Sequence, residues 1–271
     1  MTRIKGLRIS PDLTLPLDFI TQTAAILAKR RVGKSYTASV IAEEMVKAGL
    51  PWVAIDPTGA WWGLRASSDG EAEGLPVVIL GGAHADVPLE PTAGKVIADL
   101  VVDHPGWYVI DLSGFDSQAE QDRFSTDFGW RLFYRKQKSR AAMHLFIDEA
   151  DSVAPQRPFH GQEKMLGAYE AIVRRGGVYG IGCTLITQRP SVLNKNVLTQ
   201  SENLIVLRIT SPQDQKAVRD WVSNHGEPDQ VQAMMGGLAS LGTGEQSGPP
   251  MICSTSESDI TANVNSFRKN Y

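Results

Sequence analysis

Several features that would direct a protein to a membrane, a secretory route or a metal cluster are scarce in this sequence. Cysteine occurs only twice in 271 residues, at Cys183 and Cys253, and neither belongs to a CxxC or other metal-binding spacing. The five histidines show no metal spacing either. The start of the chain lacks the apolar core of a signal peptide, and no run approaches the ~20 apolar residues of a membrane helix. We therefore expect a soluble, reduced, cytoplasmic protein with no membrane segment.

Positive charge is not in excess. The formal net charge is −3, with 27 Lys and Arg against 30 Asp and Glu, which argues against a protein coated in positive charge. Any contact with nucleic acid must then come from a local basic patch or from the inner face of a ring. Because 271 residues suffice for one large core and no linker or repeat divides them, we expect a single domain over residues 1–253. A polar tail is expected over residues 254–271.

A short basic loop between an apolar run and a helical segment is the most informative stretch. Its end, Gly33-Lys34-Ser35, fits the phosphate-binding pattern GxxxxGK[ST], known as Walker A, although Ala28 stands where the first glycine is usual. In this pattern backbone N–H groups surround the phosphates, the lysine contacts the β- and γ-phosphates, and the hydroxyl binds Mg²⁺. The sequence therefore predicts binding of ATP and Mg²⁺. The predicted nucleotide-binding residues are Ala28, Lys29, Arg30, Arg31, Val32, Gly33, Lys34, Ser35 and Tyr36.

Short apolar runs alternate with segments of helical period along the rest of the chain. Such alternation predicts an α/β P-loop NTPase with a mainly parallel sheet and helices on both faces. A glycine-rich stretch at residues 236–250 predicts turns around a closing C-terminal hairpin. The expected strands lie at residues 25–27, 52–56, 77–80, 107–111, 145–148, 182–187 and 203–209, and the expected helices at residues 36–48, 95–102, 120–137, 162–175 and 214–222.

Two adjacent acids, Asp148 and Glu149, end one of the apolar runs. In this pattern, known as Walker B, the first carboxylate holds a water on Mg²⁺ and the second orients and deprotonates the attacking water. Acids at strand ends also cap the following turn, and in isolation that is the simpler interpretation. Downstream of a phosphate-binding loop, the pair predicts ATP hydrolysis with Glu149 as the base.

Three further polar residues have two interpretations each. Gln188, at a strand end, fits an amide that hydrogen-bonds both the γ-phosphate and the attacking water, and it also fits an amide that satisfies a loop backbone. Arg174 and Arg175 end a helical segment, where the helix dipole favours cations. They also fit arginine fingers that reach a neighbouring subunit and stabilise charge in the transition state. Arg208, expected within a strand, is a weaker candidate for that role.

Together these segments resemble the ATPase core of HerA-like proteins in the HerA/FtsK superfamily of DNA pumps. The resemblance runs from about Thr14 to Cys253 and is carried by ILAKRRVGKSYTASVIAEEM, AIDPTGAWWGLRA, HLFIDEAD, VRRGGVYGIGCTLITQRPSVLNKNVLTQ and NLIVLRITSPQDQ. It implies an additional-strand catalytic-glutamate (RecA-like) P-loop fold, a homo-oligomeric ring of six subunits, and ATP-driven DNA translocation or unwinding. The site residues that it implies are Lys34, Ser35, Asp148, Glu149 and Gln188.

The loop after the second expected strand leaves two questions open. Asp56 aligns with an acid near the family's active site, and it fits a turn acid before Pro57 at least as well. Trp61 and Trp62, together with Trp52, fit a platform on which nucleic-acid bases stack, although packing in the core or at an interface is the more frequent role of such aromatic residues.

The chain departs from the family pattern in three places. Members usually carry a β-barrel domain before the phosphate-binding loop, whereas the sequence has only a short segment there, so a motor core alone is expected. The family commonly has another basic residue after Arg-Gly, where Gly177 and Val178 stand here. Arg31 occupies a loop position at which glycine is usual. Two other functions stay open: an ATPase that moves protein in secretion or conjugation, and a nucleotide-switched assembly module of a nuclease or defence complex.

Overall fold

An eight-stranded sheet organises the part of the chain that the computed structural model describes, namely residues 6–10, 13–66, 73–225, 232, 235–236 and 251–254. The sheet contains β3 to β10, and β1 and β2 form a separate pair. The strands of the described residues are β1 (Leu7–Ser10), β2 (Leu13–Leu15), β3 (Thr23–Leu27), β4 (Trp52–Asp56), β5 (Val78–Leu80), β6 (Trp107–Asp111), β7 (Met143–Ile147), β8 (Ile181–Thr187), β9 (Asn203–Val206) and β10 (Met251–Ser254). The sheet has the order β10-β9-β3-β8-β7-β4-β6-β5. Its neighbouring strands are parallel, except that β10 pairs antiparallel with β9.

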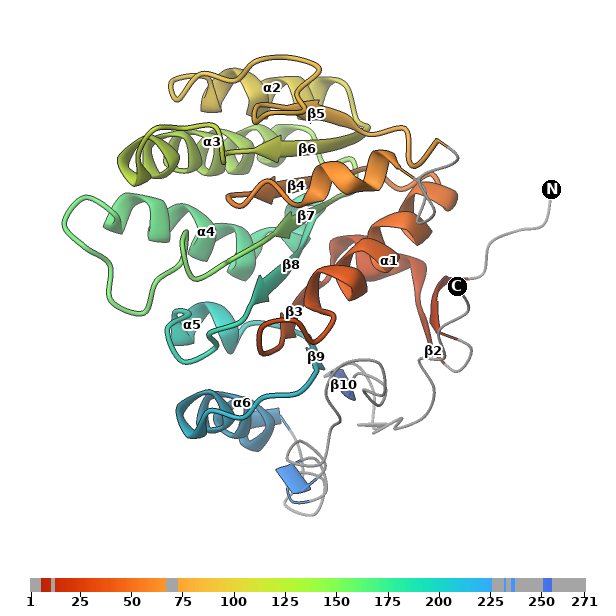
Figure 1. Cartoon of the computed structure of the whole chain (residues 1–271), viewed down its shortest axis with the longest axis vertical. Coiled ribbons are helices and arrows are strands. Elements are labelled where there is room, and N and C mark those ends of the chain that lie inside the picture. The colour runs from red at the N-terminus through yellow and green to blue at the C-terminus, as the bar shows by residue number, and fades with distance from the viewer. Residues whose placement is uncertain are drawn as a thin grey trace.

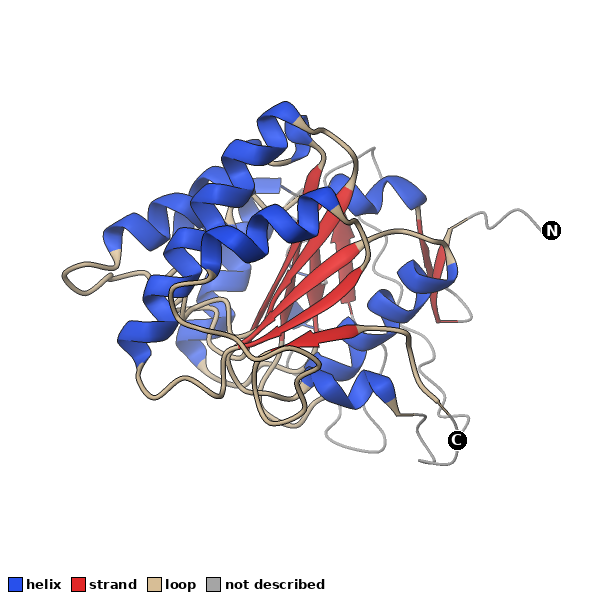
Figure 2. Ribbon diagram, turned by 90° about the horizontal axis from the view of Figure 1, so that it is seen from above, coloured by secondary structure: helices blue, strands red, loops and turns tan. Residues whose placement is uncertain are grey.

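Helices flank this sheet on both faces (Figures 1 and 2). The helices are α1 (Lys34–Lys47), α2 (Gly94–Asp103), α3 (Gln118–Lys138), α4 (Glu163–Arg175), α5 (Lys195–Leu198) and α6 (Pro212–His225), with 3₁₀ helices η1 (Leu17–Thr21), η2 (Trp61–Arg65) and η3 (Gly177–Tyr179). Figure 1 shows α2, α3 and α4 on one side of the sheet and α1 on the other. A small hairpin of β1 and β2 lies apart from the main sheet.

Each central strand contributes to two cores because successive side chains point to opposite faces. In β4, Val53 and Ile55 belong to the core formed with α2, α3 and α4. Trp52 and Ala54 belong to the core formed with α1 and the hairpin. With both faces covered, a strand is apolar throughout rather than alternating, which is why these segments are continuous apolar runs. The predicted α/β architecture is confirmed.

The strand order brings three loops to one place. β3 lies between β9 and β8, and β8 lies between β3 and β7. Because these strands are parallel, their carboxyl ends lie at the same edge of the sheet, where ligands of α/β proteins bind. The loops that follow Leu27, Ile147 and Thr187 therefore meet there.

Two expected details differ from the structure near the C-terminal part. Residues 203–209 were expected to form one strand, but β9 ends at Val206, so Arg208 lies beyond the strand. Val206 pairs with Leu27, the last residue of β3, and beyond it the carbonyl of Arg208 still accepts from the backbone N–H of Lys29 at 2.9 Å. The closing strand β10 pairs with β9 after the intervening α6, so the two are not joined by a tight hairpin.

The predicted tail and glycine-rich turns fall mostly outside the described residues. Ser254, expected to begin the tail, is the last residue of β10 and pairs with Asn203. Residues 237–250 and 255–271 are not described. Among the helices that the structure describes, none combines the length and the apolar character required to cross a membrane.

His144 in β7 shows how strictly the sheet interior selects the charge of a side chain. Its Nδ1 donates to the carbonyl of Ile20 at 3.2 Å, and its Nε2 lies 2.7 Å from the hydroxyl of Thr184, which donates to it. The ring stacks on Phe19 at a centroid distance of 5.2 Å. Burial lowers the pKa of His144 from 6.5 to about 4, against the opposing effect of its backbone hydrogen bonds. The fold therefore holds the neutral imidazole.

Folding stability should fall in acid because of His144. Between pH 6.5 and about 4 the unfolded chain carries a protonated imidazole and the folded chain does not, so the free energy of unfolding drops as the pH falls, by about 3 kcal/mol in full. His144→Gln should remove this part of the pH dependence, and the same change at the exposed His160 should retain it. Urea unfolding at pH 7 and pH 4.5 measures both. An unchanged pH dependence in the His144 variant would contradict the account.

Candidate active site

A cavity of about 530 Å³ opens at the edge of the sheet where the loops after β3, β7 and β8 meet. Segments more than a hundred residues apart in sequence line it together, because parallel strands deliver their loops to one edge. The lining residues are Lys29, Arg30, Arg31, Gly33, Lys34, Ser35, Tyr36, Thr58, Asp148, Glu149, Asp151, Gln188 and Arg189. The predicted phosphate-binding loop, acidic pair and glutamine are thus brought to the same cavity.

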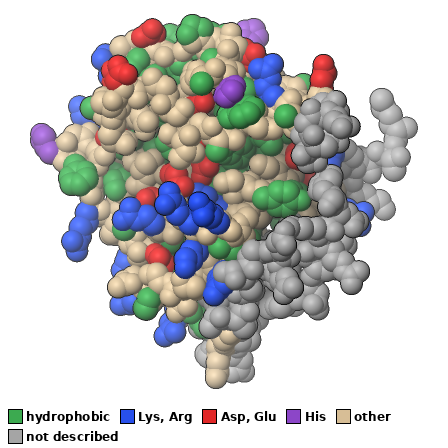
Figure 3. Space-filling model, in the orientation of Figure 1, with side chains coloured by type: hydrophobic (Ala, Val, Ile, Leu, Met, Phe, Trp, Pro, Cys, Tyr) green, Lys and Arg blue, Asp and Glu red, His purple; other side chains and the backbone are tan. Residues whose placement is uncertain are grey.

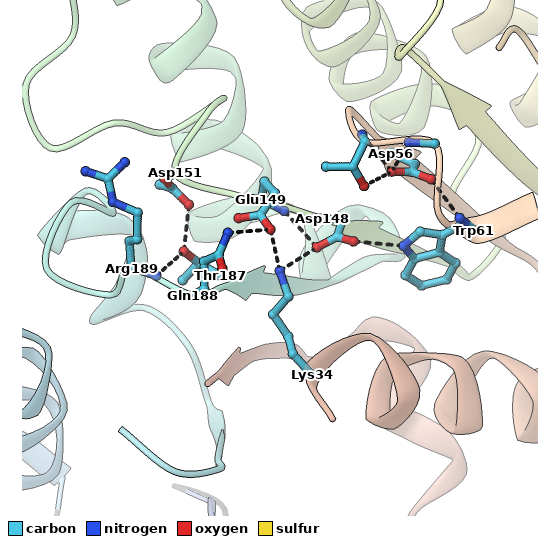
Figure 4. Close-up of polar contacts among 11 residues, drawn as sticks. Lys34, Asp56, Trp61, Asp148, Glu149, Asp151, Thr187, Gln188 and Arg189 are labelled. Carbon is cyan, nitrogen blue, oxygen red and sulfur yellow. Dashed lines mark hydrogen bonds and ion pairs between the residues drawn. The ribbon is translucent and has the colours of Figure 1, made fainter. Parts of the chain in front are cut away.

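Lys34 lies at the centre of this site (Figure 4). Its ammonium donates to Asp148 Oδ1 at 3.0 Å and to Glu149 Oε1 at 2.7 Å, and its side chain is only 11% exposed. Burial alone lowers the pKa of Lys34, but the charges of the two acids and their hydrogen bonds outweigh burial and raise it. The lysine is therefore a fixed cation between two carboxylates.

The two oxygens of Asp148 have different partners. Oδ1 accepts from Lys34 and from the backbone N–H of Glu149 at 2.9 Å, whereas Oδ2 accepts from the indole N–H of Trp61 at 3.1 Å. The residue is 3% exposed. An ionised carboxylate so deeply buried is stable only when it is paired and hydrogen-bonded, and Asp148 satisfies both conditions.

Glu149 is held in an unusual backbone conformation. Its φ is 45°, in the left-handed region that residues with a Cβ rarely adopt. Its Oε1 accepts from Lys34 and from the amide of Gln188 at 3.1 Å. In the part of the chain that the structure describes, Arg31 is the other non-glycine residue with positive φ, at 61°, and it lines the same cavity. Strained backbone of this kind concentrates at functional sites.

A second contact ties the loop after β7 to the loop after β8. The hydroxyl of Thr187 donates to Asp151 Oδ1 at 2.6 Å and accepts from the backbone N–H of Arg189 at 2.9 Å. Gln188 lies between these two residues and donates to Glu149 (Figure 4). The glutamine and the acid therefore face each other from two loops that are hydrogen-bonded to each other.

Three lining residues were not identified from the sequence. Asp151 and Arg189 stand beside residues that were, since Asp151 is three positions after Asp148 and Arg189 follows Gln188. Thr58 reaches the cavity from the turn after β4. The only sequence signal for Thr58 was its position after a strand that ends in an acid.

The phosphate-binding loop leads into the amino terminus of α1. Gly33 is the N-cap of α1, with φ 103°, and the first N–H groups of a helix have no partner within it. These groups, with the helix dipole, favour an anion at this place. Lys29, Arg30 and Arg31 are exposed on the cavity rim, and Figure 3 shows a cluster of basic side chains next to acidic ones on this face.

Two of the nine predicted nucleotide-binding residues do not line the cavity. The side chains of Ala28 and Val32 are buried in the core on the α1 side. The backbone N–H of Ala28 donates to the carbonyl of Thr187 at 3.3 Å, so the loop starts by extending the sheet. The small Ala28 and the apolar Val32 therefore anchor the loop to the core.

The structure does not bring Arg174 or Arg175 to the cavity of the same chain. The side chain of Arg174 is 59% exposed and lies 3.9 Å from Glu170. The guanidinium of Arg175 lies 5.0 Å from the ring centre of Phe133. Both arginines end α4, just before the start of β8, and thus lie at the amino ends of the strands. If either arginine contacts a ligand, that ligand must therefore lie in the cavity of another subunit.

Asp56 acts as a turn acid in this structure. Its Oδ1 accepts from the backbone N–H groups of Thr58 and Gly59, both at 2.9 Å, and from the Thr58 hydroxyl at 2.8 Å. Its Oδ2 accepts from the backbone N–H of Trp61 at 2.8 Å. Burial raises the pKa of Asp56, and these hydrogen bonds oppose the shift. The acid shapes the turn and does not line the cavity.

The two adjacent tryptophans have different environments. Trp61 is 3% exposed and packs against Trp52 and Phe146, as the core interpretation predicted. Trp62 is 39% exposed, and its ring stacks on His84 at a centroid distance of 3.9 Å. Only the first of the pair is therefore a core residue.

The oxygen donors of the cavity fit Mg²⁺ bound together with a phosphate. Protein sites for Mg²⁺ supply one or two carboxylates and leave the other positions to water and substrate phosphates. Asp148 and the hydroxyl of Ser35 line the same cavity, and the ammonium of Lys34 already places a positive charge 3.0 Å from Asp148 Oδ1. Among the described residues, no group of three or more His, Cys, Asp or Glu could hold a metal ion by itself.

Known proteins resemble the part of the chain that contains the acids and the glutamine. Residues 135–252 match the family model of the helicase HerA-like C-terminal domain. The chain is 35% identical over 101 residues to the DNA double-strand break repair helicase HerA of Pyrococcus furiosus, a match that covers 37% of this chain and 17% of that protein. It is 39% identical over 74 residues to the helicase of the same name from Sulfolobus acidocaldarius, covering 27% of this chain and 14% of that one. The chain thus matches less than a fifth of the length of these relatives.

Solved structures share the fold at low sequence identity. VirB4 of Thermoanaerobacter pseudethanolicus has a TM-score of 0.60 and 12% identity, covering 93% of this chain and 94% of that one. The genome packaging NTPase B204 of Sulfolobus turreted icosahedral virus 2, solved with sulfate, has a TM-score of 0.57 and 13% identity, covering 86% and 91%. These similarities establish the α/β P-loop fold. The match of residues 135–252 to the family model and the identities to the two helicases confirm the resemblance of this chain to HerA-like ATPases.

Proposed function

We propose that this chain is the ATP-hydrolysing core of a HerA-like motor, and that it assembles into a ring, of six subunits by the family pattern, which translocates DNA. The observation that carries the proposal is the single cavity in which Lys34 contacts both Asp148 and Glu149 while Gln188 contacts Glu149. A cation for phosphate, an oxygen ligand for a metal and a base for water are the components that phosphoryl transfer to water requires.

The phosphates of ATP would compete with the two acids for Lys34. In the cavity the ammonium is shared by Asp148 and Glu149, and a triphosphate offers it more negative charge. The phosphates would also accept from N–H groups at the start of α1. Ser35 and Asp148 would hold Mg²⁺, which neutralises charge that develops on the phosphates.

Glu149 becomes a base once Lys34 has turned to the phosphates. Its Oε1 then loses its strongest partner and can accept the proton of a water molecule whose oxygen attacks the γ-phosphorus as the bond to ADP breaks. Gln188 lies 3.1 Å from the same oxygen and would orient that water and contact the γ-phosphate. The glutamine would therefore link the third phosphate to the position of the base.

The assignment to DNA draws on the proteins that this chain resembles. The Pyrococcus relative is described as a DNA repair helicase and B204 as a genome packaging NTPase. Steady-state hydrolysis measured with and without duplex DNA tests this directly, and native mass measurement with and without ATP tests the ring. A DNA motor should hydrolyse ATP faster with DNA, and its DNA affinity should fall with salt by a slope of about −0.9 per phosphate contact. Slow hydrolysis that ignores DNA would favour the switch module, and a salt-insensitive interaction with DNA would favour either the protein-moving ATPase or the switch module.

Replacing Lys34 should abolish ATP binding, whereas replacing Glu149 should impair turnover. Lys34→Ala removes the fixed cation, so ATP binding should be lost. Glu149→Gln keeps the shape of the side chain but cannot take the proton of water, so binding should persist while turnover falls by 10²-fold or more, roughly the contribution of a general base. Isothermal titration and a phosphate-release assay separate the two effects. Parental turnover in the glutamine variant would show that Glu149 is not the base.

The arginines at the end of α4 should act between subunits if they are fingers. A mixture of Lys34→Ala subunits with Arg174→Ala or Arg175→Ala subunits should then hydrolyse ATP although neither partner does so alone, because a Lys34→Ala subunit still offers its arginine to a neighbour. Mixing Lys34→Ala with Glu149→Gln is the matched control, since both changes lie in the cavity of their own chain. Activity in the mixture no higher than the sum of its parts would assign the pair to the helix dipole.

Arg31→Gly should tighten ATP binding and raise turnover. The left-handed backbone at Arg31 costs a residue with a Cβ ~1–3 kcal/mol, and glycine removes that cost. Arg30→Gly is the control, because it removes a charge from the same loop at a residue without positive φ. Gly33→Ala should have the opposite effect, since it places a Cβ at φ 103°. Isothermal titration measures all three. A tenfold loss of affinity in the Arg31 variant would instead make Arg31 a phosphate ligand.

A further inference from the structure

The indole of Trp61 makes a directed contact with the acid of the cavity. Trp61 is 3% exposed and does not line the cavity, yet its Nε1 donates to Asp148 Oδ2 at 3.1 Å (Figure 4). This is the only hydrogen bond recorded for Oδ2 among the described residues, whereas Oδ1 accepts from Lys34 and from the N–H of Glu149. The buried oxygen therefore accepts from a core side chain, and the cavity oxygen accepts from Lys34, for which a phosphate ligand would compete.

The indole cannot easily turn away from Asp148. Its ring packs against Trp52 at a centroid distance of 6.1 Å and against Phe146 at 5.3 Å. Both neighbours are fully buried strand residues, in β4 and β7. The ring is therefore fixed by the sheet itself, and the direction of its N–H group is fixed with it.

Asp56 fixes the backbone of the same tryptophan. Its Oδ2 accepts from the N–H of Trp61 at 2.8 Å, while its Oδ1 closes the turn over Thr58 and Gly59. Asp56 is fully buried at the end of β4. The turn thus connects the end of one strand to the acid at the end of the neighbouring strand β7.

We propose that Trp61 is a positioning residue that holds the carboxylate of Asp148 with Oδ1 towards the cavity and so sets the affinity of the site for a divalent cation. This inference rests on the proposed function. A carboxylate that is hydrogen-bonded to a fixed donor through one oxygen presents its other oxygen in a single orientation. Less conformational entropy is then lost when a cation binds. Residues that hydrogen-bond a metal ligand in this way typically change metal affinity 10–100-fold when they are replaced. Asp56 acts on the cation through Trp61 and its turn.

Trp61→Phe tests the proposal because it keeps an aromatic ring and removes the N–H group. Mn²⁺ titrated into protein with a non-hydrolysable ATP analogue, and followed by electron paramagnetic resonance, should bind at least about tenfold more weakly. Affinity for the analogue without metal should be unchanged. Trp52→Phe is the matched control, since it removes an indole N–H from the same aromatic cluster that donates to the carbonyl of Ala42 at 3.1 Å. It should leave Mn²⁺ binding unchanged.

Thermal unfolding is measured for each variant to check that it folds. If Trp61→Phe does not fold, Asp56→Asn tests the proposal instead. An amide at Asp56 turns a donor towards the N–H of Trp61 and should weaken Mn²⁺ binding while leaving the affinity for the analogue without metal unchanged. Equal Mn²⁺ affinity in Trp61→Phe and wild type, or equal losses in Trp61→Phe and Trp52→Phe, would overturn the positioning role. Failure of the wild-type chain to bind the analogue at all would instead overturn the proposed function.

Discussion

One ammonium group between two carboxylates holds the candidate site together. Lys34 comes from the first turn of α1, and Asp148 and Glu149 come from the end of β7, so the ion pairs join the two halves of the site. Removing a buried cation from such a cluster leaves two acids without compensation, which is costly in a protein interior. These ion pairs can also be exchanged, because a ligand with more negative charge competes with the two carboxylates for the ammonium of Lys34. Stability without ligand and reactivity with ligand thus depend on the same contact.

The parallel sheet determines which residues can take part. With β3, β8 and β7 adjacent, the phosphate-binding loop, the glutamine and the acids leave the sheet at one edge. The backbone is then strained at Arg31 and Glu149, both on the cavity. The apolar side chains buried in the two cores stabilise the fold against this strain, since the strands beneath the loops are covered on both faces. Rigid strands and strained loops are the combination expected where side chains must be aimed at a ligand.

Much of this arrangement could be predicted from the sequence, because apolar runs followed by polar residues indicate strand ends at an active edge. Asp148, Glu149 and Gln188 were found in this way. The order of the strands could not be predicted, since any of the buried strands fits any interior position. The contact between Trp61 and Asp148 was also missed, because it joins residues 87 positions apart in the chain. Aromatic residues in a loop give no signal of which acid they face.

The exchange of partners by Lys34 is the central claim, and a crystal structure with a non-hydrolysable ATP analogue and Mg²⁺ tests it most directly. The account predicts that the ammonium leaves Asp148 Oδ1 and Glu149 Oε1, now at 3.0 and 2.7 Å, and donates to the β- and γ-phosphates. The indole of Trp61 should keep its contact with Asp148. An analogue bound outside this cavity, or bound within it while Lys34 retains both carboxylates, would contradict the account.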